Sequence, residues 1–379
     1  MAGKVAFVYH GTVTKDIRIR KELAFLSADF HVDLIEDHTA IRQNTFQKWL
    51  SMTCKIDYSA AKSIRAFLQE SQPDVVTCQD LYLLPTVLRE VLFLAKETKS
   101  APIPVVADLH ELYSVAIPLY AAWRPPMVRF LLSMTSHNGR SWQRVEQNFL
   151  PRCKGIVTVC PEAVVHYKQY AGSSIPMVVF GNKEPRSAVC PATPTPFRPP
   201  IRLVYFGSYG AHRGIADFCS YLAGASSPCE FHIIGKVPDR AADALRSLLS
   251  GSPASLVLHG FIPEEEALHR LKDMHYMVIP HLRNAHTDAT LPHKLYQAFA
   301  MGLPSLVSDC PPLVREAMAS KAAIVFRHDP SASETIRAAL SVTESDYRTM
   351  SNNAIGYAKG DGALDEEYSD LKKLYSSLC

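Results

Sequence analysis

The feature that most constrains the fold is a regular alternation of short apolar runs with longer amphipathic segments. The runs before a proline-rich stretch at 190–200 are 4–10, 31–36, 74–78, 103–109, 155–160 and 176–181, and those after it are 201–207, 230–235, 255–260, 276–281, 303–309 and 322–327. Continuous apolar strands that are each followed by a helix are typical of parallel sheets buried on both faces. The sequence therefore predicts two α/β domains, each built on a doubly wound, Rossmann-like parallel sheet.

The stretch CPATPTPFRPP at 190–200 marks the boundary between these domains. Proline fixes φ and donates no amide hydrogen bond, so this stretch cannot continue a helix or a central strand. We expect a first domain at 1–186, a linker at 187–200 and a second domain at 201–360. The final segment, 361–379, is expected to be helical, and packing against the first domain is one placement open to it. Open parallel sheets bind ligands at the carboxyl ends of their strands, so a cleft between the domains is expected.

Composition excludes several classes of protein. The chain of 379 residues is 47% hydrophobic and 20% charged with a net charge of +3, which indicates a globular protein and speaks against a nucleic-acid-coating one. No apolar run reaches the ~18 residues that a membrane span needs. Nine cysteines without a CxxC pair argue against a zinc ribbon or a closed disulfide framework. The first apolar run begins at residue 4, which leaves no room for a secretory signal, so a cytoplasmic location is expected.

The most informative stretch is TLPHKLYQAFAMGLPSLVSDCPPLVREAM at 290–318. Pro292 suits the first turn of a helix, Gly302 suits its end, and Pro304 prevents its continuation. The start of such a helix offers unpaired amides and a positive dipole end, which favour a diphosphate. Lys294, in the first turn, adds a full positive charge.

This stretch resembles the donor-binding signature of GT-B glycosyltransferases, especially those of the family 4 type. That signature is a Pro-x-Lys-Leu-Tyr/Phe-Glu helix followed by Ala-x-Gly-x-Pro and a strand. FGSYGAHRGIADFCSYL at 206–222 is similar to the first donor-side strand, its glycine turn and a Lys/Arg-Gly helix start. The segments 231–239 and 259–281 are similar to the strand–loop pairs that enclose the nucleotide base. The resemblance covers nearly the whole second half and implies the GT-B fold.

The resemblance implies roles for individual residues on the donor side. Arg213 and Lys294 would contact the donor phosphates and support catalysis. Gly207, Ser208 and Gly235 follow the strands at the nucleotide, Phe261 and Ile262 lie in the base-contacting loop, and Leu291 and Pro292 form the turn beside the sugar and phosphates. These assignments place a nucleotide-sugar donor, with UDP favoured as its nucleotide, on the second domain.

The chain departs from the family pattern at three positions. Gln297 stands where the family usually has a glutamate that binds the nucleotide ribose, and Ala289 stands where many members have a second glutamate eight residues earlier. Asp288 and His286 lie close enough in sequence to substitute. In addition, Ser208 occupies the position of a basic residue, which leaves one phosphate cation fewer.

In the first half, HGTVTKDIRIRKELAFL at 10–26 runs from a strand through a glycine turn into a basic amphipathic helix. The resemblance places this region near the acceptor, with Gly11, Asp16, Arg18 and Arg20 as candidate acceptor-side residues. An exposed helix face is the alternative for the three charged residues. His110, in VVADLHELYS, follows the carboxyl end of a strand, where functional side chains collect. It could bind the transferred sugar or position the acceptor hydroxyl, or it could be a hydrogen-bonded core histidine.

The segment 123–154 is basic and amphipathic, with apolar residues beside Arg124 and Arg129. Such a segment can lie on an anionic membrane, which would suit a peripheral enzyme with a lipid-linked acceptor. A solvated basic face and interdomain packing are the alternatives.

These observations predict a hexosyltransferase-type enzyme that moves a sugar from a nucleotide-diphosphate sugar to an acceptor hydroxyl in glycan, glycolipid or polysaccharide biosynthesis. The resemblance implies retention of anomeric configuration. No Asp-x-Asp occurs, and His281 and His286 have poor spacing for metal ligands, so we expect neither a metal nor a cofactor. Walker A and GxGxxG motifs are missing, which argues against an NTPase or a nicotinamide enzyme. A nucleotide-sugar epimerase of the same fold and a catalytically silent subunit that supports a partner enzyme are the alternatives.

Overall fold

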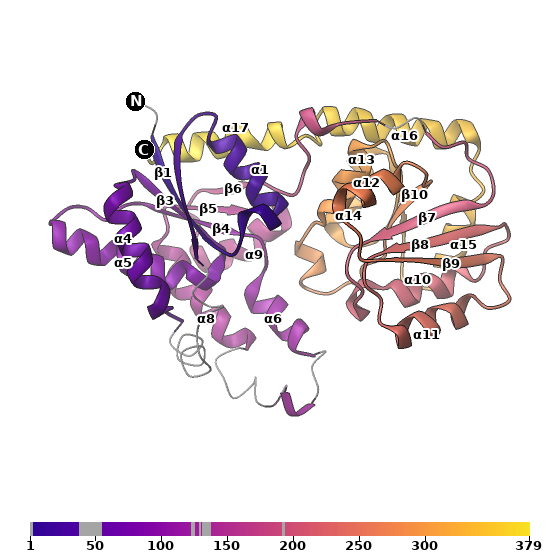
Figure 1. Ribbon diagram of the computed structural model, residues 1–379, viewed down its shortest axis with the longest axis horizontal. Helices are drawn as coiled ribbons and strands as arrows, with labels where there is room; N and C mark the ends of the chain where they lie inside the picture. Colours follow the sequence, from indigo (N-terminus) through magenta and orange to yellow (C-terminus); the bar gives the residue numbers. More distant parts are fainter. Residues whose placement is uncertain (1–2, 38–54, 123–125, 129, 131–137, 192–193) are drawn as a thin grey trace. The chain divides into compact units, whose positions relative to one another are not determined.

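The computed structural model describes residues 3–37, 55–122, 126–128, 130, 138–191 and 194–379 (Figure 1). The chain divides into two units. The first unit comprises residues 1–181 and 367–379, and the second comprises residues 182–366. Each unit contains a six-stranded parallel sheet with helices packed around it, so the predicted α/β fold of two doubly wound sheets is confirmed.

The sheet of the first unit has the strand order β2-β1-β3-β4-β5-β6, and every neighbouring pair is parallel. Its strands are β1 (Lys4–His10), β2 (His31–Asp37), β3 (Val75–Gln79), β4 (Val105–Leu109), β5 (Gly155–Thr158) and β6 (Met177–Val179). The chain steps to one side of β1 to form β2 and to the other side to form β3. This change of direction is a topological switch point, and it opens a crevice beyond the carboxyl ends of β1 and β3.

The helices of the first unit are α1 (Ile17–Leu26), α4 (Tyr58–Ser71), α5 (Asp80–Thr98), α6 (Tyr113–Ala122), α8 (Gly139–Phe149) and α9 (Pro161–Ala171), with 3-10 turns at Val13–Lys15 and Leu150–Arg152. Three of these helices, α1, α4 and α8, begin with a side-chain cap among the described residues. The carboxylate of Asp16 accepts a hydrogen bond from the amide of Ile19 at the start of α1. Asp57 caps α4 in the same way. Such caps satisfy amides that have no partner inside the helix.

The end of the chain contributes to the first unit. Helix α17 (Leu364–Ser376) carries Tyr375, which is fully buried and shares a 2.6 Å hydrogen bond with the hydroxyl of Thr77 on β3. Tyr368 donates a hydrogen bond to Asp29, and its ring lies 5.0 Å from that of Phe25 on α1. Figure 1 shows α17 in yellow beside α1. Residues 367–379 therefore form part of the core of the first unit.

The sheet of the second unit has the order β12-β11-β10-β7-β8-β9 and is also parallel. Its strands are β7 (Ile201–Phe206), β8 (Cys229–Ile234), β9 (Ala254–Gly260), β10 (Tyr276–Ile279), β11 (Ser305–Ser308) and β12 (Ala323–Phe326). The strands β7, β8, β10 and β11 are mostly buried, as their continuous apolar runs require, whereas the edge strands β9 and β12 are mostly half-buried. The order reverses between β7 and β10, so the switch point lies at the loops that follow these two strands.

The helices of the second unit follow its strands in alternation. They are α10 (Ile215–Leu222), α11 (Asp239–Leu249), α12 (Glu264–Leu271), α13 (His293–Ala300), α14 (Pro311–Ser320), α15 (Ala332–Ala339) and α16 (Glu344–Lys359), with 3-10 turns at Ala211–Arg213 and Thr287–Ala289. The proline-rich stretch packs on this unit over the residues that the structure describes. The ring of Phe197 stacks on Tyr347 at 4.8 Å, and the amide of Cys190 donates to the carbonyl of Ala300.

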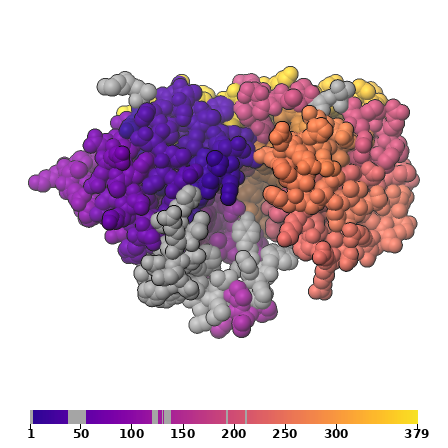
Figure 2. Space-filling model, in the orientation of Figure 1, coloured from indigo at the N-terminus to yellow at the C-terminus, as the bar shows by residue number. Residues whose placement is uncertain are grey.

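Part of the basic segment 123–154 lies outside the described residues, namely 123–125, 129 and 131–137. Within the described part, Met127 is 74% exposed and Phe130 is 64% exposed. The described residues 126–128 and 130 appear as magenta atoms at the surface in Figure 2. Among the residues that the structure describes, no helix combines the length and the apolar character needed to cross a membrane.

Candidate functional site

Two loops meet at the switch point of the second sheet. The loop after β7 contains Gly207 and Arg213, and the loop after β10 contains His281. The guanidinium of Arg213 donates a 3.1 Å hydrogen bond to Nε2 of His281, which joins the two loops. Because ligands of doubly wound sheets bind beyond the carboxyl ends of the strands at this point, the pair lies where a ligand is expected.

Two glycines bring backbone close together at this edge of the sheet. Gly235 follows β8 with a φ of 150°, and a Cβ atom there would collide with the carbonyl oxygen of Gly207. Gly207 follows β7 with a φ of 143°, and a Cβ atom there would collide with Nζ of Lys294. Both positions require a residue without a side chain. The glycines therefore allow the Lys294 ammonium to reach the end of β7.

Lys294 lies in the first turn of α13. Its Nζ is 4.5 Å from the centre of the Tyr205 ring, which is within the range of a cation–π interaction. Burial disfavours the charged ammonium and Arg213 repels it, which together lower the pKa of Lys294 to about 7. Lys294 is a cation that the fold brings close to a second cation.

The positive charge of Arg213 also lowers the pKa values of the neighbouring histidines. Burial, followed by the charge of Arg213, lowers the pKa of His281 well below its usual value. Burial and the same guanidinium lower the pKa of His286 to about 4. These histidines are therefore neutral near pH 7, and His281 can accept the hydrogen bond from Arg213.

The charges of Arg213 and Lys294 are not compensated by carboxylates. In the part of the chain that the structure describes, neither side chain forms an ion pair with an acidic residue, and the buried Nε of Arg213 has no hydrogen-bond partner. Helix α13 adds the partial positive charge of its first turn, and its N-cap is Pro292, which has no capping side chain. We call Arg213, Lys294, Tyr205 and His281 the Lys294 cluster. Its electrostatics suit a phosphate group.

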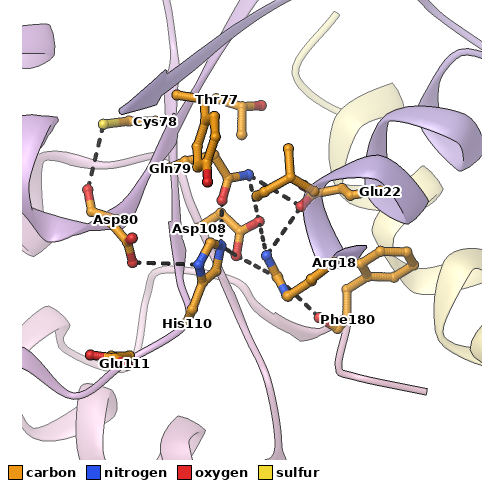
Figure 3. Close-up of polar contacts among 12 residues, drawn as sticks. Arg18, Glu22, Thr77, Cys78, Gln79, Asp80, Asp108, His110, Glu111 and Phe180 are labelled. Carbon is orange, nitrogen blue, oxygen red and sulfur yellow. Dashed lines mark hydrogen bonds and ion pairs between the residues drawn. The ribbon is translucent and has the colours of Figure 1, made fainter. Parts of the chain in front are cut away.

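A second cluster lies at the switch point of the first sheet (Figure 3). We call its members, Arg18 and Glu22 of α1, Gln79 of β3, Asp108 of β4 and His110, the Arg18 cluster. The guanidinium of Arg18 donates to both carboxylate oxygens of Asp108, at 2.9 and 2.6 Å. It also donates to the carbonyl of Phe180 and to the carboxyl of Glu22. This bidentate geometry is the strongest form of an ion pair.

The two carboxyl groups of the Arg18 cluster differ in protonation. Burial opposes the ionisation of Asp108, but the guanidinium of Arg18 outweighs it and holds the pKa of Asp108 at about 2. Burial and the charge of Asp108 raise the pKa of Glu22 well above its usual value. The positive charge of Arg18 is therefore balanced by the carboxylate of Asp108, while Glu22 is shifted toward its neutral form.

His110 follows β4 and contacts the other members of the Arg18 cluster through Gln79. Its Nε2 lies 2.5 Å from Oε1 of Gln79, and its Nδ1 lies 3.6 Å from Oδ1 of Asp80. Asp80, the first residue of α5, has a φ of 65°, which is uncommon for a residue with a side chain. The sheet thus places His110 at its carboxyl edge, with a polar group on each side of the ring.

The chain resembles known proteins in both sequence and structure. Residues 200–344 match the family model for glycosyl transferases group 1. The protein is a glycosyltransferase. The resemblance predicted from the motifs of the second half is therefore confirmed.

Solved structures with the GT-B fold resemble this glycosyltransferase over its full length. Sucrose-phosphate synthase from Thermosynechococcus elongatus matches with a TM-score of 0.71 and 12% identity over 99% of each chain. The lipopolysaccharide outer core galactosyltransferase WaaB matches with a TM-score of 0.63 and 13% identity, over 99% of this chain and 100% of that one. HepE from Anabaena, in complex with UDP and glucose, matches with a TM-score of 0.59 and 10% identity, over 99% and 100%. No curated protein matches the sequence.

The remaining donor-side residues of the glycosyltransferase border the Lys294 cluster or the base-contacting loop. Ser208 is exposed, and its carbonyl accepts a hydrogen bond from the hydroxyl of Tyr205. Leu291 is buried, and its carbonyl accepts from Asn182. Phe261 follows β9 and is 87% exposed, and Ile262 beside it is half-buried. An exposed phenylalanine provides a surface on which a planar ring can stack.

Gln297 is buried, and its amide donates a 2.9 Å hydrogen bond to the carboxylate of Glu264. Glu264, the first residue of α12, therefore brings a carboxylate to the position where the resemblance implies one. Asp288 instead forms hydrogen bonds through both carboxylate oxygens with Arg283. Ala289 is buried in the 3-10 turn before α13. Sequence reasoning missed Glu264 because it lies 33 residues away from Gln297.

The four candidate residues on the acceptor side take different positions. Gly11 has a φ of 148°, and a Cβ atom there would lie 3.0 Å from the ring of Tyr9. Asp16 caps α1 and accepts a hydrogen bond from Tyr9, and Arg20 is exposed. Arg18 is buried and forms an ion pair with Asp108, so it holds that carboxylate in place and does not line the surface of the site.

The structure adds Glu22, Gln79 and Asp108 to the residues that the motifs suggested. Of these three residues, Asp108 could have been recognised from the sequence as a candidate, because a charged residue inside the apolar strand VVADL needs a buried partner. No group of three or more His, Cys, Asp or Glu residues in the described ranges is arranged to hold a metal ion.

Proposed function

We propose that this glycosyltransferase moves a sugar from a nucleotide-diphosphate sugar, with a UDP-sugar as the favoured donor, to an acceptor hydroxyl. The observation that carries the proposal is the pair of uncompensated cations, Arg213 and Lys294, at the switch point of the second sheet. Departure of the nucleoside diphosphate builds negative charge, and preorganised cations stabilise that charge. Two structures of HepE, one with UDP and one with UDP and glucose, support this donor class.

The nucleotide would occupy the edge of the second sheet beside these cations. Gly207 and Gly235 leave room for its backbone contacts, Phe261 faces its base, and the carboxylate of Glu264 accepts hydrogen bonds from its ribose hydroxyls. The Gln297 amide holds that carboxylate in place. In this assignment Glu264 provides the carboxylate for the ribose, although Gln297 places an amide at the helix position where the family usually has a glutamate.

We infer that the diphosphate requires no metal ion and the protein no cofactor. Support comes from Arg213, Lys294 and the first amides of α13, which already supply positive charge at one place. The resemblance to the family 4 type supports retention of anomeric configuration. In a retaining transfer, the leaving phosphate can help to deprotonate the acceptor, so His110 need not be the base.

The acceptor would bind to the first unit near His110, and a sugar or a lipid-linked sugar fits a role in glycan, glycolipid or polysaccharide biosynthesis. The exposed side chains of Met127 and Phe130, within the basic segment 123–154, support contact with an anionic membrane surface. This contact would make the protein a peripheral enzyme on the cytoplasmic face.

The test is calorimetric titration of UDP, GDP and ADP in EDTA. We expect one nucleotide to bind without metal, and Lys294→Ala to weaken its binding by about 10- to 100-fold because a charged hydrogen bond contributes about 1.5–3 kcal/mol. Lys272→Ala is the matched control, because that lysine is exposed on the same unit, and it should leave binding unchanged. Equal affinities of Lys294→Ala and the wild type would contradict the phosphate assignment.

A screen of sugar acceptors follows with the nucleotide that binds. Turnover that requires an acceptor supports the transferase assignment for this donor. Conversion of the nucleotide sugar without an acceptor would instead identify an epimerase of the same fold.

A further inference from the structure

Gln79 connects His110 to the charged part of the Arg18 cluster. It is the last residue of β3, its side chain is fully buried, and in the sheet it pairs with Asp108 of β4. Its amide nitrogen lies 2.7 Å from Oδ2 of Asp108 and 3.1 Å from Oε2 of Glu22, and its oxygen lies 2.5 Å from Nε2 of His110. Figure 3 shows this side chain between the two carboxyl groups and the imidazole.

The surrounding acceptors fix the orientation of the Gln79 amide. Asp108 is a carboxylate and can only accept hydrogen bonds, because its pKa is held at about 2 by Arg18 against the effect of burial. The NH₂ group of Gln79 must therefore face Asp108, since a flipped amide would bring two acceptor oxygens together. The oxygen of Gln79 is then left to face His110.

This orientation determines which nitrogen of His110 carries a proton. The oxygen of Gln79 can only accept, so Nε2 of His110 must donate to it across the 2.5 Å contact. A neutral ring with its proton on Nδ1 would place two lone pairs against each other inside the buried cluster. Two forms of the His110 ring are compatible with Gln79, namely the neutral ring protonated on Nε2 and the charged ring protonated on both nitrogens. Both carry a proton on Nε2.

We propose that Gln79 is a positioning residue that holds the proton of His110 on Nε2, so that Nδ1 is the only ring atom able to accept a hydrogen bond or a proton from a substrate hydroxyl. The identity of that hydroxyl rests on the proposed function, but the tautomer does not. Nδ1 lies 3.6 Å from Oδ1 of Asp80, which is too long for a direct hydrogen bond.

The ion pair beneath the site supports this arrangement. Arg18 keeps Asp108 ionised, Asp108 orients Gln79, and Gln79 orients the ring of His110. Three elements, α1, β3 and β4, each provide one member of this chain of contacts. In neutral histidine the hydrogen bond of one nitrogen decides the role of the other.

The test is ¹⁵N NMR of the histidine side chains in the protein without substrate, at a pH at which the His110 ring is neutral. The signals of His110 are identified by their loss in His110→Ala. We expect a protonated Nε2 and an unprotonated Nδ1 in the wild type. A neutral ring protonated on Nδ1 would overturn the proposal, and this result would not depend on any enzymatic activity.

Variants of Gln79 separate positioning from structural support. Gln79→Met has a similar size but no acceptor, and we expect a mixture of tautomers. Gln79→Glu retains an acceptor oxygen for Nε2, and we expect it to retain the wild-type tautomer. Gln69→Met, the same substitution at an exposed site on α4, is the matched control. An unchanged tautomer in folded Gln79→Met would overturn the proposal, and if this variant fails to fold, the wild-type spectrum decides.

A kinetic measurement then links the tautomer to the transferase. We expect Gln79→Met to lower kcat by about 100-fold, the lower end of the roughly 10²- to 10⁴-fold contribution of a positioned acid–base group. The affinity for UDP should be unchanged, because the Lys294 cluster belongs to the other unit. An unchanged kcat alongside an altered tautomer would overturn the role toward substrate. Loss of UDP binding in every form, wild type included, would contradict the donor assignment and leave the tautomer result intact.

Discussion

Each unit holds a cation at the carboxyl edge of its sheet, and the two cations differ in how their charge is compensated. Arg18 makes two hydrogen bonds to one carboxylate and a third to a backbone carbonyl. Lys294 has an aromatic ring and a second cation as its neighbours, and no carboxylate forms an ion pair with it among the described residues. A compensated cation stabilises the fold around it, whereas an uncompensated one is suited to bind an anion from solution.

The energetic consequences of the two arrangements are opposite. Removing one partner of a buried ion pair leaves the other charge without compensation, which destabilises a protein strongly. Removing a half-buried cation that has no carboxylate partner relieves a desolvation cost that the folded protein bears until an anion binds. The comparison therefore predicts opposite effects of equivalent substitutions in the two units.

The largest expected effect is that of Arg18→Met. It leaves the carboxylate of Asp108 buried and unpaired, so we expect the free energy of unfolding of the first unit to fall by about 3–5 kcal/mol. The chain has three tryptophans, Trp49, Trp123 and Trp142, all before residue 182, so tryptophan fluorescence during urea unfolding reports on this unit.

Arg20→Met is the matched control for this prediction. Arg20 lies on the same helix but is exposed, and a surface substitution of this kind changes stability by about 0.5 kcal/mol or less. Equal unfolding midpoints for the two variants would show that the Arg18–Asp108 ion pair does not support the first unit.

The second prediction concerns the pH dependence of nucleotide binding at Lys294. Because the pKa of Lys294 is lowered to about 7, its ammonium group loses a proton in the free protein as the pH rises above 7. Binding of a diphosphate then requires proton uptake, and the affinity for UDP should fall by up to about tenfold per pH unit above pH 8. Calorimetry in buffers with different ionisation enthalpies measures the number of protons taken up.

Lys294→Arg provides the control, because a guanidinium remains charged throughout this range. This variant should bind UDP with little dependence on pH between 7 and 9. If the wild type shows the same flat profile and no proton uptake, Lys294 is charged in the free protein and the contrast with Arg18 is smaller than the structure indicates.

The smallest expected effect is that of Lys294→Met on the protein without ligand. In the wild type the lysine has a folded pKa of about 7, below its ordinary value of 10.5, so between these values the unfolded chain binds the additional proton. The stability of the second unit should therefore rise with pH across this window. The Met variant lacks this dependence and should be more stable at pH 7 by about 1 kcal/mol.

Hydrogen exchange of the β7 amides measures this difference separately from the first unit. Lys272→Met, at an exposed position, serves as the control and should match the wild type. A variant at Lys294 that is less stable than the wild type at pH 7 would show that the cation–π contact with Tyr205 outweighs the cost of burial.

The fold and two members of the Lys294 cluster, Arg213 and Lys294, could be named from the sequence for a physical reason. Parallel strands buried on both faces must be continuously apolar, and the helix that follows Pro292 has sequence signals at both ends. These constraints are local, so they leave a pattern along the chain. The positions of Gly207 and Lys294 follow from the same elements.

The Arg18 cluster was only partly accessible from sequence. Its contacts join residues that are 90 positions apart in the case of Arg18 and Asp108, and no local pattern determines such a pair. The helix at 10–26 suggested an exposed basic face, but Arg18 and Glu22, four residues apart, both point into the unit. Charged residues on an amphipathic helix are therefore ambiguous in sequence, because they can form a buried ion pair as well as an exposed face.

The last thirteen residues of the described chain have a consequence for the order in which the protein is made. Leu374 packs against Gly155, and the buried hydroxyl of Tyr375 forms a hydrogen bond with that of Thr77 on β3. A ribosome delivers these residues only after all of 182–366 has been synthesised. The nascent chain can therefore complete its second unit first, while the first sheet lacks the packing of residues 367–379 until they are synthesised.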